Sequence, residues 1–390
     1  MVQIKSYPAR NGDAFLVTAS SDPFAMLIDG GYGRTFHQHI KSDLENLATN
    51  GYALDLVVAT HVDADHISGL LSFFRQNGTA QAPNIIPVRE VLHNSLRSLV
   101  SPTADQTAIR QDDLALLQDI RLQAYHQPEE ASSLGQDISA RQGVSLAQLL
   151  YEGGYQWNTQ VGKTPIGEGG LVDLSLLQGH ISILGPNKDR LDALKEWWVS
   201  EMRRMGWVGS LHDLDDAFEF VCLHEIVDPG EQLLASSEAD LALAYVPDNS
   251  VTNGSSISLI VEVESRRLLF LGDSWANDIV AALAVDGPSI FDAVKISHHG
   301  SARNTSLELL TLVDSPHFFI STNGNGHDHP DFAVIKAIVD RPAKFCRTIH
   351  FNYSTPASQR LRSYKSATGA DFVVNEAETE WVTINKPNTK

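Results

Sequence analysis

The seven residues from Thr60 to His66, T-H-V-D-A-D-H, hold four side chains that can bind a metal. They follow a short apolar run that predicts a strand and precede a run that predicts a helix. Side chains at such a turn can converge in front of the strand end, and their imidazole nitrogens and carboxylate oxygens suit Zn²⁺ or Mn²⁺. An Asp here can also cap the helix, but capping explains one acid and not two acids flanked by two histidines. The four side chains are His61, Asp63, Asp65 and His66.

The H-V-D-A-D-H segment resembles the HxHxDH signature of the metallo-β-lactamase superfamily, with Asp63 in place of the middle His. This variant is similar to the branch that includes the metallo-β-lactamase domain of the DNA-uptake channel protein ComEC. The resemblance covers residues 1–95 and 180–340. Further segments resemble that branch in the expected order: NGDAFLV, LIDGG, NGSSISLIVE, LLFLGDS, KISHHGS and ISTNGNGHDHP.

The resemblance implies two divalent metal ions, Zn²⁺ or Mn²⁺. It assigns His61 and Asp63 to one ion and Asp65 and His66 to the other, with Asp273 as a bridge between them. Asp273 follows an apolar run, as a bridging carboxylate at a strand end should, although Gly-Asp after a strand is usually only a turn. The implied metal ligands are His61, Asp63, Asp65, His66, Asp273 and His298.

The same resemblance implies catalytic and substrate-binding residues. Asp65 would orient the attacking hydroxide besides binding metal, and His329 is either a ligand or the group that protonates the leaving oxygen. The sequence leaves open which of His298, His299 and His329 binds a metal, and the His298–His299 pair can instead cap the following helix. The candidate catalytic residues are Asp65, His299 and His329, and the candidate substrate-binding residues are Ser301 and Asn323. Arg347 is a third candidate for substrate binding, because it lies in the basic stretch 341–365.

One departure from the superfamily pattern concerns the metal. The usual ligand His before the strand that leads to Asp273 is absent, and the segment 253–256, N-G-S-S, stands there. Oxygen donors then outnumber imidazoles at one ion, which favours harder ions such as Mn²⁺, while Zn²⁺ stays open. His93 and His180 can complete the ligand set, but a single histidine is more often a core or surface residue.

Strand-like and helix-like runs alternate in both halves of the chain. Apolar runs with strand character are separated by amphipathic stretches such as 35–50 and 331–340. This order predicts layered α and β structure, and the resemblance implies an α/β fold of the four-layer αββα metallo-β-lactamase type. The predicted strands are 2–9, 14–20, 24–31, 54–60, 180–186, 256–264, 266–274, 293–301 and 317–324.

Residues 96–162 differ from the rest, because they carry helical periodicity and no comparable strand. We therefore expect a catalytic domain formed by residues 1–95 and 163–390, with 96–162 as a helical insertion beside the mouth of the active site. The stretch 211–240 is rich in acids and contains no Lys or Arg, which is typical of an exposed loop.

Composition excludes several classes of protein. The net charge of −19 over 390 residues argues against an indiscriminate polycation, and the stretch 341–365, basic and free of acids, is the likelier anion-facing surface. Cys222 and Cys346 form neither a disulfide framework nor a thiolate zinc site. No apolar run approaches the ~18 residues that span a bilayer, and no signal peptide is evident. We therefore expect a cytoplasmic protein that does not use a membrane.

Two bridged divalent ions suit hydrolysis at phosphorus or at a strained carbonyl, and the residues alone do not choose the substrate. The ComEC-like resemblance favours a free-standing bacterial phosphodiesterase, most simply a nuclease acting on DNA. One alternative is a hydrolase of a small molecule, a cyclic nucleotide or a lactone, with the insertion as a lid. Another is a protein that recruits a partner through 96–162 and 211–240. An open basic groove would favour the nuclease.

Overall fold

The structure is a computed structural model of the chain. It describes residues 1–20, 23–95, 98–99, 146–161, 164–174, 179–204, 240–325 and 328–385. Most of the expected insertion and nearly all of the acidic stretch lie outside these ranges. The division into a catalytic domain and an insertion therefore stays a prediction.

The first sheet is built from the N-terminal strands. Its strand order is β18-β1-β2-β3-β4-β7. The strands β1, β2 and β3 are antiparallel neighbours, whereas β3, β4 and β7 run parallel, so the carboxyl ends of β3 and β4 share one edge. The bounds are β1 (Val2–Ser6), β2 (Phe15–Ala19), β3 (Phe24–Ile28), β4 (Leu56–Ala59), β7 (Val91–His93) and β18 (Val382–Ile384).

The second sheet has the strand order β17-β16-β15-β13-β11-β10-β9-β8. The strands from β11 to β17 are parallel, so their carboxyl ends also lie along one edge. The bounds are β8 (Leu171–Leu174), β9 (Gly179–Gly185), β10 (Ser258–Val263), β11 (Arg266–Phe270), β13 (Ala293–Lys295), β15 (His317–Ile320), β16 (Arg347–Phe351) and β17 (Phe372–Asn375). Two short pairs complete the strands: β5 (Gly78–Thr79) with β6 (Ala82–Pro83), and β12 (Ser289–Ile290) with β14 (Val313–Asp314).

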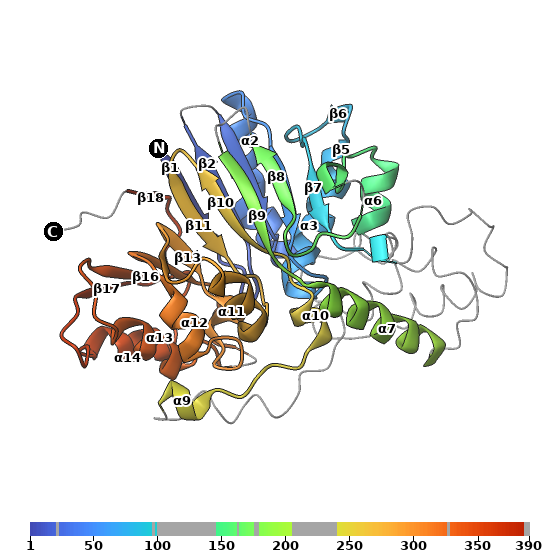
Figure 1. The fold of residues 1–390 in the computed structure, drawn as a ribbon. Coiled ribbons are helices and arrows are strands. Elements are labelled where there is room, and N and C mark those ends of the chain that lie inside the picture. The colour runs from blue at the N-terminus through green and yellow to red at the C-terminus, as the bar shows by residue number, and fades with distance from the viewer. Residues whose placement is uncertain are drawn as a thin grey trace.

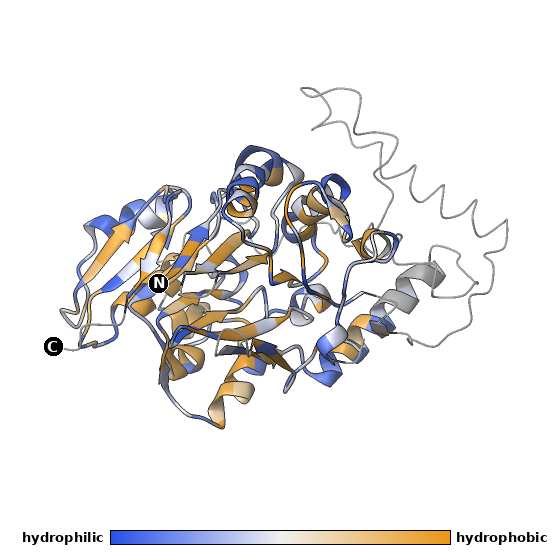
Figure 2. Ribbon diagram, turned by 90° about the horizontal axis from the view of Figure 1, so that it is seen from above, coloured by the Kyte–Doolittle hydropathy of each residue, from blue (hydrophilic) through white to orange (hydrophobic). Residues whose placement is uncertain are grey.

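The two sheets pack face to face through a buried apolar layer. Within it the Phe15 ring meets Phe270 and Phe319 edge to face, with ring centroids 5.9 and 6.3 Å apart. Because both faces of these strands are covered, their residues are largely hydrophobic rather than alternating, as the orange strands in Figure 2 show.

Helices cover the outer face of each sheet, which gives four layers (Figure 1). On the first sheet lie α1 (Gly33–Thr35), η1 (Phe36–Ile40), α2 (Lys41–Thr49), α3 (Ala64–Asn77) and α6 (Leu146–Glu152). On the second lie α9 (Leu241–Ala244), α11 (Ala276–Ala284), α12 (Leu307–Leu312), α13 (Phe332–Val339) and α14 (Pro356–Ser363). The expected αββα architecture is confirmed. The remaining helical elements are η2 (Thr159–Val161), α7 (Lys188–Arg204), α10 (Val251–Gly254) and η6 (Ser297–Gly300).

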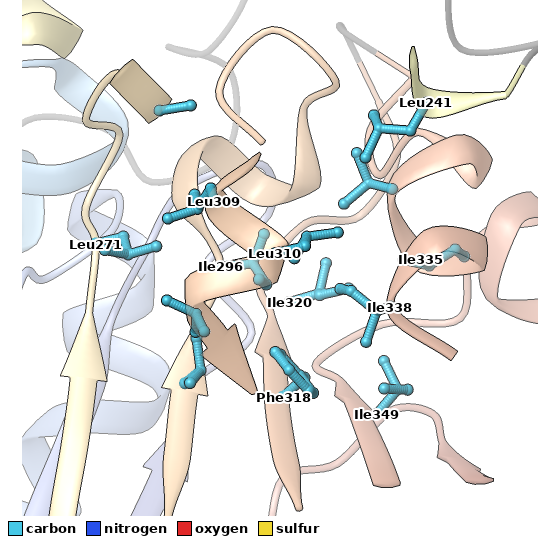
Figure 3. Packing of buried hydrophobic residues seen from close by; sticks show 14 of the residues in the cluster. Leu241, Leu271, Ile296, Leu309, Leu310, Phe318, Ile320, Ile335, Ile338 and Ile349 are labelled. Carbon is cyan, nitrogen blue, oxygen red and sulfur yellow. The ribbon is translucent and has the colours of Figure 1, made fainter. Parts of the chain in front are cut away.

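Three buried side chains fix the ends of neighbouring strands in the second sheet. Leu271, Ile296 and Ile320 belong to the same buried cluster as side chains of α12 and α13, and they lie at the ends of three neighbouring strands (Figure 3). Each is fully buried, so the backbone that follows it leaves the sheet from a rigid position. Asp273 follows Leu271 by two positions, and His298 and His299 follow Ile296 by two and three.

Two glycines let α3 approach the turn after β3. A Cβ atom on Gly69 would lie 1.9 Å from the Gly30 carbonyl oxygen, and one on Gly30 would lie 2.5 Å from the Leu70 nitrogen. Because neither glycine has a side chain, the Gly30 N–H reaches the His66 carbonyl at 2.8 Å. The start of α3 is thereby held against the first sheet.

None of the helices in the described ranges has the length and apolar character required to cross a membrane.

Candidate metal centre

The predicted ligand turn lies between β4 and α3. Asp63 immediately precedes α3, yet its side chain makes no capping hydrogen bond to the helix. Its Oδ2 atom instead accepts a hydrogen bond from the Thr252 hydroxyl at 3.2 Å and lies 3.5 Å from His61 Nε2. The capping interpretation therefore does not apply to Asp63.

The second sheet supplies Asp273 after β11 and the His298–His299 pair after β13. Both histidines have positive backbone φ angles, 44° and 56°. A left-handed conformation costs a residue other than glycine roughly 1–2 kcal/mol, so the surrounding contacts must hold this turn. One such contact is the hydrogen bond from the His298 N–H to the Gly272 carbonyl at 3.0 Å. The helix that follows has Ser306 as its cap, so the pair does not act as a helix cap.

Four imidazoles surround one oxygen of Asp273. The contacts are longer than most hydrogen bonds, and two atoms each about 2.1 Å from one tetrahedral ion lie about 3.4 Å apart. The spacing therefore fits side chains that bind metal ions together. The distances from Asp273 Oδ2 to the Nε2 atoms are 3.4 Å for His66 and His299, 3.8 Å for His298 and 3.9 Å for His61.

The Nδ1 atoms of the two first-sheet histidines are both tied to Asp29. His66 Nδ1 lies 2.8 Å from Asp29 Oδ2. His61 Nδ1 lies 3.1 Å from the Thr60 hydroxyl, which itself donates to Asp29 Oδ2 at 2.7 Å. These contacts place hydrogen on Nδ1 and turn each Nε2 atom toward Asp273, which is the arrangement typical of metal-binding histidines.

In the two histidines of the second sheet, Nδ1 is also bound to an acceptor, and Nε2 faces Asp273. His298 Nδ1 lies 2.8 Å from Asn304 Oδ1, and His299 Nδ1 lies 2.8 Å from the Ser321 carbonyl oxygen. All four imidazoles therefore present Nε2 to the same carboxylate, although they come from two sheets.

Two further carboxylates and several unsatisfied atoms complete the cluster. Asp65 lies between two histidines, with Oδ1 4.0 Å from His66 Nε2 and Oδ2 3.7 Å from His299 Nε2. Within the described residues, His61 Nε2, Asp63 Oδ1 and Asp273 Oδ1 are buried and have no hydrogen-bond partner. Buried polar atoms rarely lack a partner, and these atoms are the donors that a divalent cation requires. The His/Asp groups therefore fit such a cation.

A lysine lies inside the same cluster. Lys295 Nζ forms an ion pair with Asp13, lies 3.6 Å from Asp273 Oδ1 and donates to the Gly272 carbonyl at 2.8 Å. Burial opposes its charge, but Asp13 and Asp273 raise its pKa. Burial likewise opposes the charge on Asp13, yet Lys295 and His299 lower the pKa of that carboxyl to about 2. Lys295 is thus a cation built into an acidic site.

Two of the four imidazoles, those of His66 and His299, have raised pKa values when no cation is bound. Burial disfavours the charged form of His299, but Asp273 and Asp13 raise its pKa to about 10. The pKa of His66 is raised well above its usual value against the same effect of burial, through Asp273, Asp29 and Asp65. A cation that binds the Nε2 atoms must displace these protons, so metal binding and proton release are coupled.

Arg347 does not lie at the cluster. It is the first residue of β16, at the amino end, whereas the cluster is at the carboxyl ends of the neighbouring parallel strands. Its guanidinium is fully buried and bound to Asp314, with Nε 2.9 Å from Oδ1 and Nη2 2.7 Å from Oδ2, while Nη1 donates to the Arg341 carbonyl at 2.7 Å. The expectation that Arg347 binds substrate is wrong, because no guanidinium nitrogen remains for a phosphate.

Two other cations of the basic stretch 341–365 are also engaged within the protein. Arg341 donates to the Leu310 and Val313 carbonyls and to Asp314. Arg362 pairs with Glu376 at 3.0 Å. Three of the six cations of the expected anion-facing surface therefore have acidic partners within the chain.

The other expected substrate contacts lie near the cluster. Ser301 follows the histidine pair, but it is fully buried and its hydroxyl accepts from the Arg303 N–H at 3.2 Å. Asn323 is half-buried, and its Oδ1 accepts from the Asn325 N–H at 2.9 Å. Both local contacts shape the loops that carry them.

His329 lies beside the cluster without joining the four imidazoles. Its ring centroid is 5.3 Å from that of His298, and Nδ1 is 3.6 Å from Asp331 Oδ2. Burial lowers the pKa of His329. Of the alternative ligands, His93 stacks on Trp157 and His180 lies 3.8 Å from Glu262, and neither belongs to a His/Asp group of the described residues.

Sequence reasoning did not single out several side chains that shape the centre. Asp13 and Asp29 stand in NGDAFLV and LIDGG, segments that carry the resemblance, and each lies at a strand end. Their position at a strand end in these segments was the sequence feature that could have identified both as residues of the centre. Lys295 reads as an ordinary strand residue, and nothing in the sequence marks its contact with two acids. Asp248 and Asn304 likewise carry no local signal. The unassigned side chains at the centre are Asp13, Asp29, Asp248, Lys295 and Asn304.

Comparison with known proteins supports the fold. Residues 7–144 match the family model described as the metallo-beta-lactamase superfamily. No curated protein sequence matches the chain. A similar solved structure is the metallo-beta-lactamase fold protein YhfI from Bacillus subtilis, at 8% identity and a TM-score of 0.39, with 98% of this chain and 100% of that chain covered. The match over residues 7–144 and the αββα layers show that the chain has the metallo-β-lactamase fold.

Proposed function

We propose that the protein is a phosphodiesterase that depends on divalent metal ions. The observation that carries this proposal is the single Asp273 oxygen faced by four Nε2 atoms at 3.4–3.9 Å. A carboxylate shared between two ion positions matches the arrangement used for in-line displacement at phosphorus. The mixed set of imidazole and carboxylate donors suits Zn²⁺ or Mn²⁺.

The donors divide into two groups that share Asp273. His61 and Asp63 form one group, Asp65, His66 and His299 form the other, and His298 lies beside His299 as a further donor. When bound, the ions supply an activated water at neutral pH and neutralise charge on the substrate oxygens.

The chain's own residues then orient the reaction. The Asn11 amide donates to Asp65 Oδ2 at 3.3 Å, and the Tyr32 hydroxyl holds Asn11 at 3.1 Å, so Asp65 is fixed from the side of the β1–β2 loop. His329 lies on the opposite side, next to His298, and is our candidate for moving a proton to the leaving oxygen.

Two arginines replace Arg347 as candidate phosphate contacts. Arg10 directly precedes Asn11, which contacts Asp65, and its N–H donates to the Tyr353 hydroxyl at 3.0 Å. Arg303 directly precedes Asn304, which contacts His298. Both cations therefore stand on loops that carry parts of the centre, where a phosphate can meet them.

A small phosphodiester, such as a cyclic nucleotide, is the second candidate substrate beside DNA. The observation that favours it is the internal pairing of Arg341, Arg347 and Arg362, which reduces the expected basic surface. The net charge of −19 also repels a long polyanion at low ionic strength.

The experiment that tests the proposal measures hydrolysis by metal-stripped protein after Mn²⁺ or Zn²⁺ is returned. The substrates are end-labelled single- and double-stranded DNA, cyclic nucleotides, an activated phosphodiester and a lactone. We expect metal-dependent cleavage of at least one phosphodiester, which Asp65→Ala abolishes. Cleavage of the lactone alone would contradict the proposal.

A matched carboxylate serves as the control. Asp55 stands at the other end of β4, where it accepts from the Ala25 N–H at 3.0 Å and pairs with Arg89 at 2.9 Å. Asp55→Ala should lower stability and leave the rate per folded molecule unchanged. Equal loss of activity in both variants would show that Asp65 acts only through folding.

A further inference from the structure

His298 is the one imidazole of the centre whose direction depends on a chain of side chains from the second half of the molecule. Its Nδ1 atom lies 2.8 Å from Asn304 Oδ1, and the Asn304 amide nitrogen lies 2.9 Å from Asp248 Oδ2. Asn304 is completely buried, and Asp248 and His298 are 5% and 8% exposed. Water therefore has little access to any of these contacts.

The partners of Asn304 determine which way its amide points. The nitrogen faces Asp248 Oδ2 and, at 3.0 Å, the Asp273 carbonyl, and both atoms can only accept hydrogen bonds. The amide oxygen must therefore face His298, and an amide oxygen also only accepts. It follows that His298 carries its hydrogen on Nδ1, which leaves the lone pair of Nε2 directed toward Asp273.

Asp248 is itself held in place. Its Oδ2 also accepts from the Asn253 amide at 2.9 Å, and its Oδ1 accepts from the N–H groups of Asn249 and Ser250 at 2.7 and 3.0 Å. A carboxylate with this many donors has little freedom to rotate. The segment 248–253 therefore anchors the far end of the chain of contacts.

The neighbouring imidazole is supported differently. His299 Nδ1 meets the main-chain carbonyl of Ser321, which no substitution at that residue removes. His298 has a strained φ of 44° and a side-chain partner that can be changed by mutation. The two adjacent histidines thus offer an internal comparison.

We propose that Asn304 and Asp248 are positioning residues that select the Nδ1–H form of His298 and aim its Nε2 atom into the metal centre. The proposal rests on the metal site of the proposed function and not on its substrate. Loss of a contact of this kind lowers metal affinity by about 10–100-fold.

The test is a double-mutant cycle read out as metal affinity. Mn²⁺ and Zn²⁺ are titrated calorimetrically into metal-stripped wild type, Asn304→Ala, His298→Ala and the double variant. We expect Asn304→Ala to weaken the tightest affected site by about 10–100-fold, and to have no further effect once His298 is already Ala. Additive losses would overturn the proposal, because they would mean that Asn304 acts through the Asp273 backbone or through general packing.

Two more variants guard against a folding artefact. Asn77 is another fully buried asparagine, at the far end of α3, and its amide contacts Ile86 O and Tyr155 OH at 3.0 Å. Asn77→Ala should lower the melting temperature without changing metal affinity. Asp248→Asn keeps the shape of the anchor, and should weaken metal binding in wild type but not in His298→Ala.

The outcome separates this inference from the substrate proposal. Calorimetry measures the metal affinities of the double-mutant cycle even if no phosphodiester is cleaved. Conversely, the protein can cleave a phosphodiester even if the losses of metal affinity in the cycle are additive. If Asn304→Ala fails to fold, Asp248→Asn carries the same cycle. Unchanged metal affinity in the folded variants would contradict the positioning role.

Discussion

The second sheet buries charged side chains at both of its ends, and the two groups are satisfied to very different degrees. At the carboxyl ends, Asp273 lies among four imidazoles, and its Oδ1 atom has no hydrogen-bond partner in the described structure. At the amino ends, Asp314 accepts from both Arg341 and Arg347, and every guanidinium nitrogen of Arg347 donates. In this group, among the described residues, only Arg341 Nε is buried without a hydrogen-bond partner. Buried acidic and basic residues therefore form a candidate binding site at one end of the sheet and structural ion pairs at the other.

The difference shows how a buried charge can be interpreted. A buried charged group whose hydrogen bonds are nearly complete stabilises the fold. A group in which several buried polar atoms lack partners is a candidate site for a bound ion or for catalysis. Backbone strain follows the same division, because the left-handed His298 and His299 lie in the unsatisfied group. The predictions below test whether function and stability separate in this way.

The largest effect is expected from Asp273→Asn. Asparagine keeps the shape but loses the charge that both groups of donors share, so metal-dependent turnover should fall at least about 10³-fold. Metal content after dialysis, measured together with the rate, checks this expectation. Wild-type metal content in the variant would contradict the bridging role.

Lys295→Met should destabilise the metal-free protein by roughly 3 kcal/mol, because it leaves Asp13 and Asp273 buried without their cation. A bound metal ion compensates the same charge, so the loss should be smaller when metal is present. Urea unfolding with chelator and with Mn²⁺ measures both values. An equal loss under both conditions would show that Lys295 acts independently of the centre.

At the opposite end of the sheet, Arg347→Gln should cost roughly 2 kcal/mol of stability, since Arg341 still neutralises Asp314. Turnover at a temperature where the variant is folded should match wild type. Chemical unfolding and the rate per folded molecule give the two readings. A large loss of turnover in stable protein would restore Arg347 as a substrate contact.

The smallest effect concerns pH and a third buried group of the same sheet. His350 stacks on Phe319 and lies 3.0 Å from His317. Burial, with a contribution from His317, lowers the pKa of His350 to about 3. The unfolded chain then binds a proton that the folded chain excludes, so stability is complete above about pH 6.5 and is lost as the pH falls toward 3.

His350→Gln removes that proton and should flatten the decline in stability between pH 6.5 and 4. Urea unfolding at the two pH values measures it, with the exposed His180→Gln as the control. If both variants lose stability as steeply as wild type, His350 does not contribute to acid lability.

Much of the first half of the centre was predictable from the sequence. His61, Asp63, Asp65 and His66 are close in sequence, and a strand-to-helix turn leaves them few ways to diverge. The strands around them were predicted as well, because buried strands have continuous apolar runs. The family resemblance added Asp273 and the His298–His299 pair in their correct order.

The rest depended on contacts between segments far apart in the chain. Whether Arg347 faces solvent or Asp314 is decided by which end of β16 it occupies and by the loop that ends β14. Whether His298 or His299 joins the cluster was open in the sequence, and a left-handed turn brings both toward Asp273.

The contiguous ligand turn, the alternation of strands and helices, and the chemistry of the donors follow from local sequence alone. The position of Lys295 between two acids, the connection of His298 to Asp248 through Asn304, and the burial of Arg347 in the core arise only in the folded chain. Spacing within one turn restricts a few dihedral angles directly. Contacts across two sheets depend on strand order and register, which no local pattern specifies.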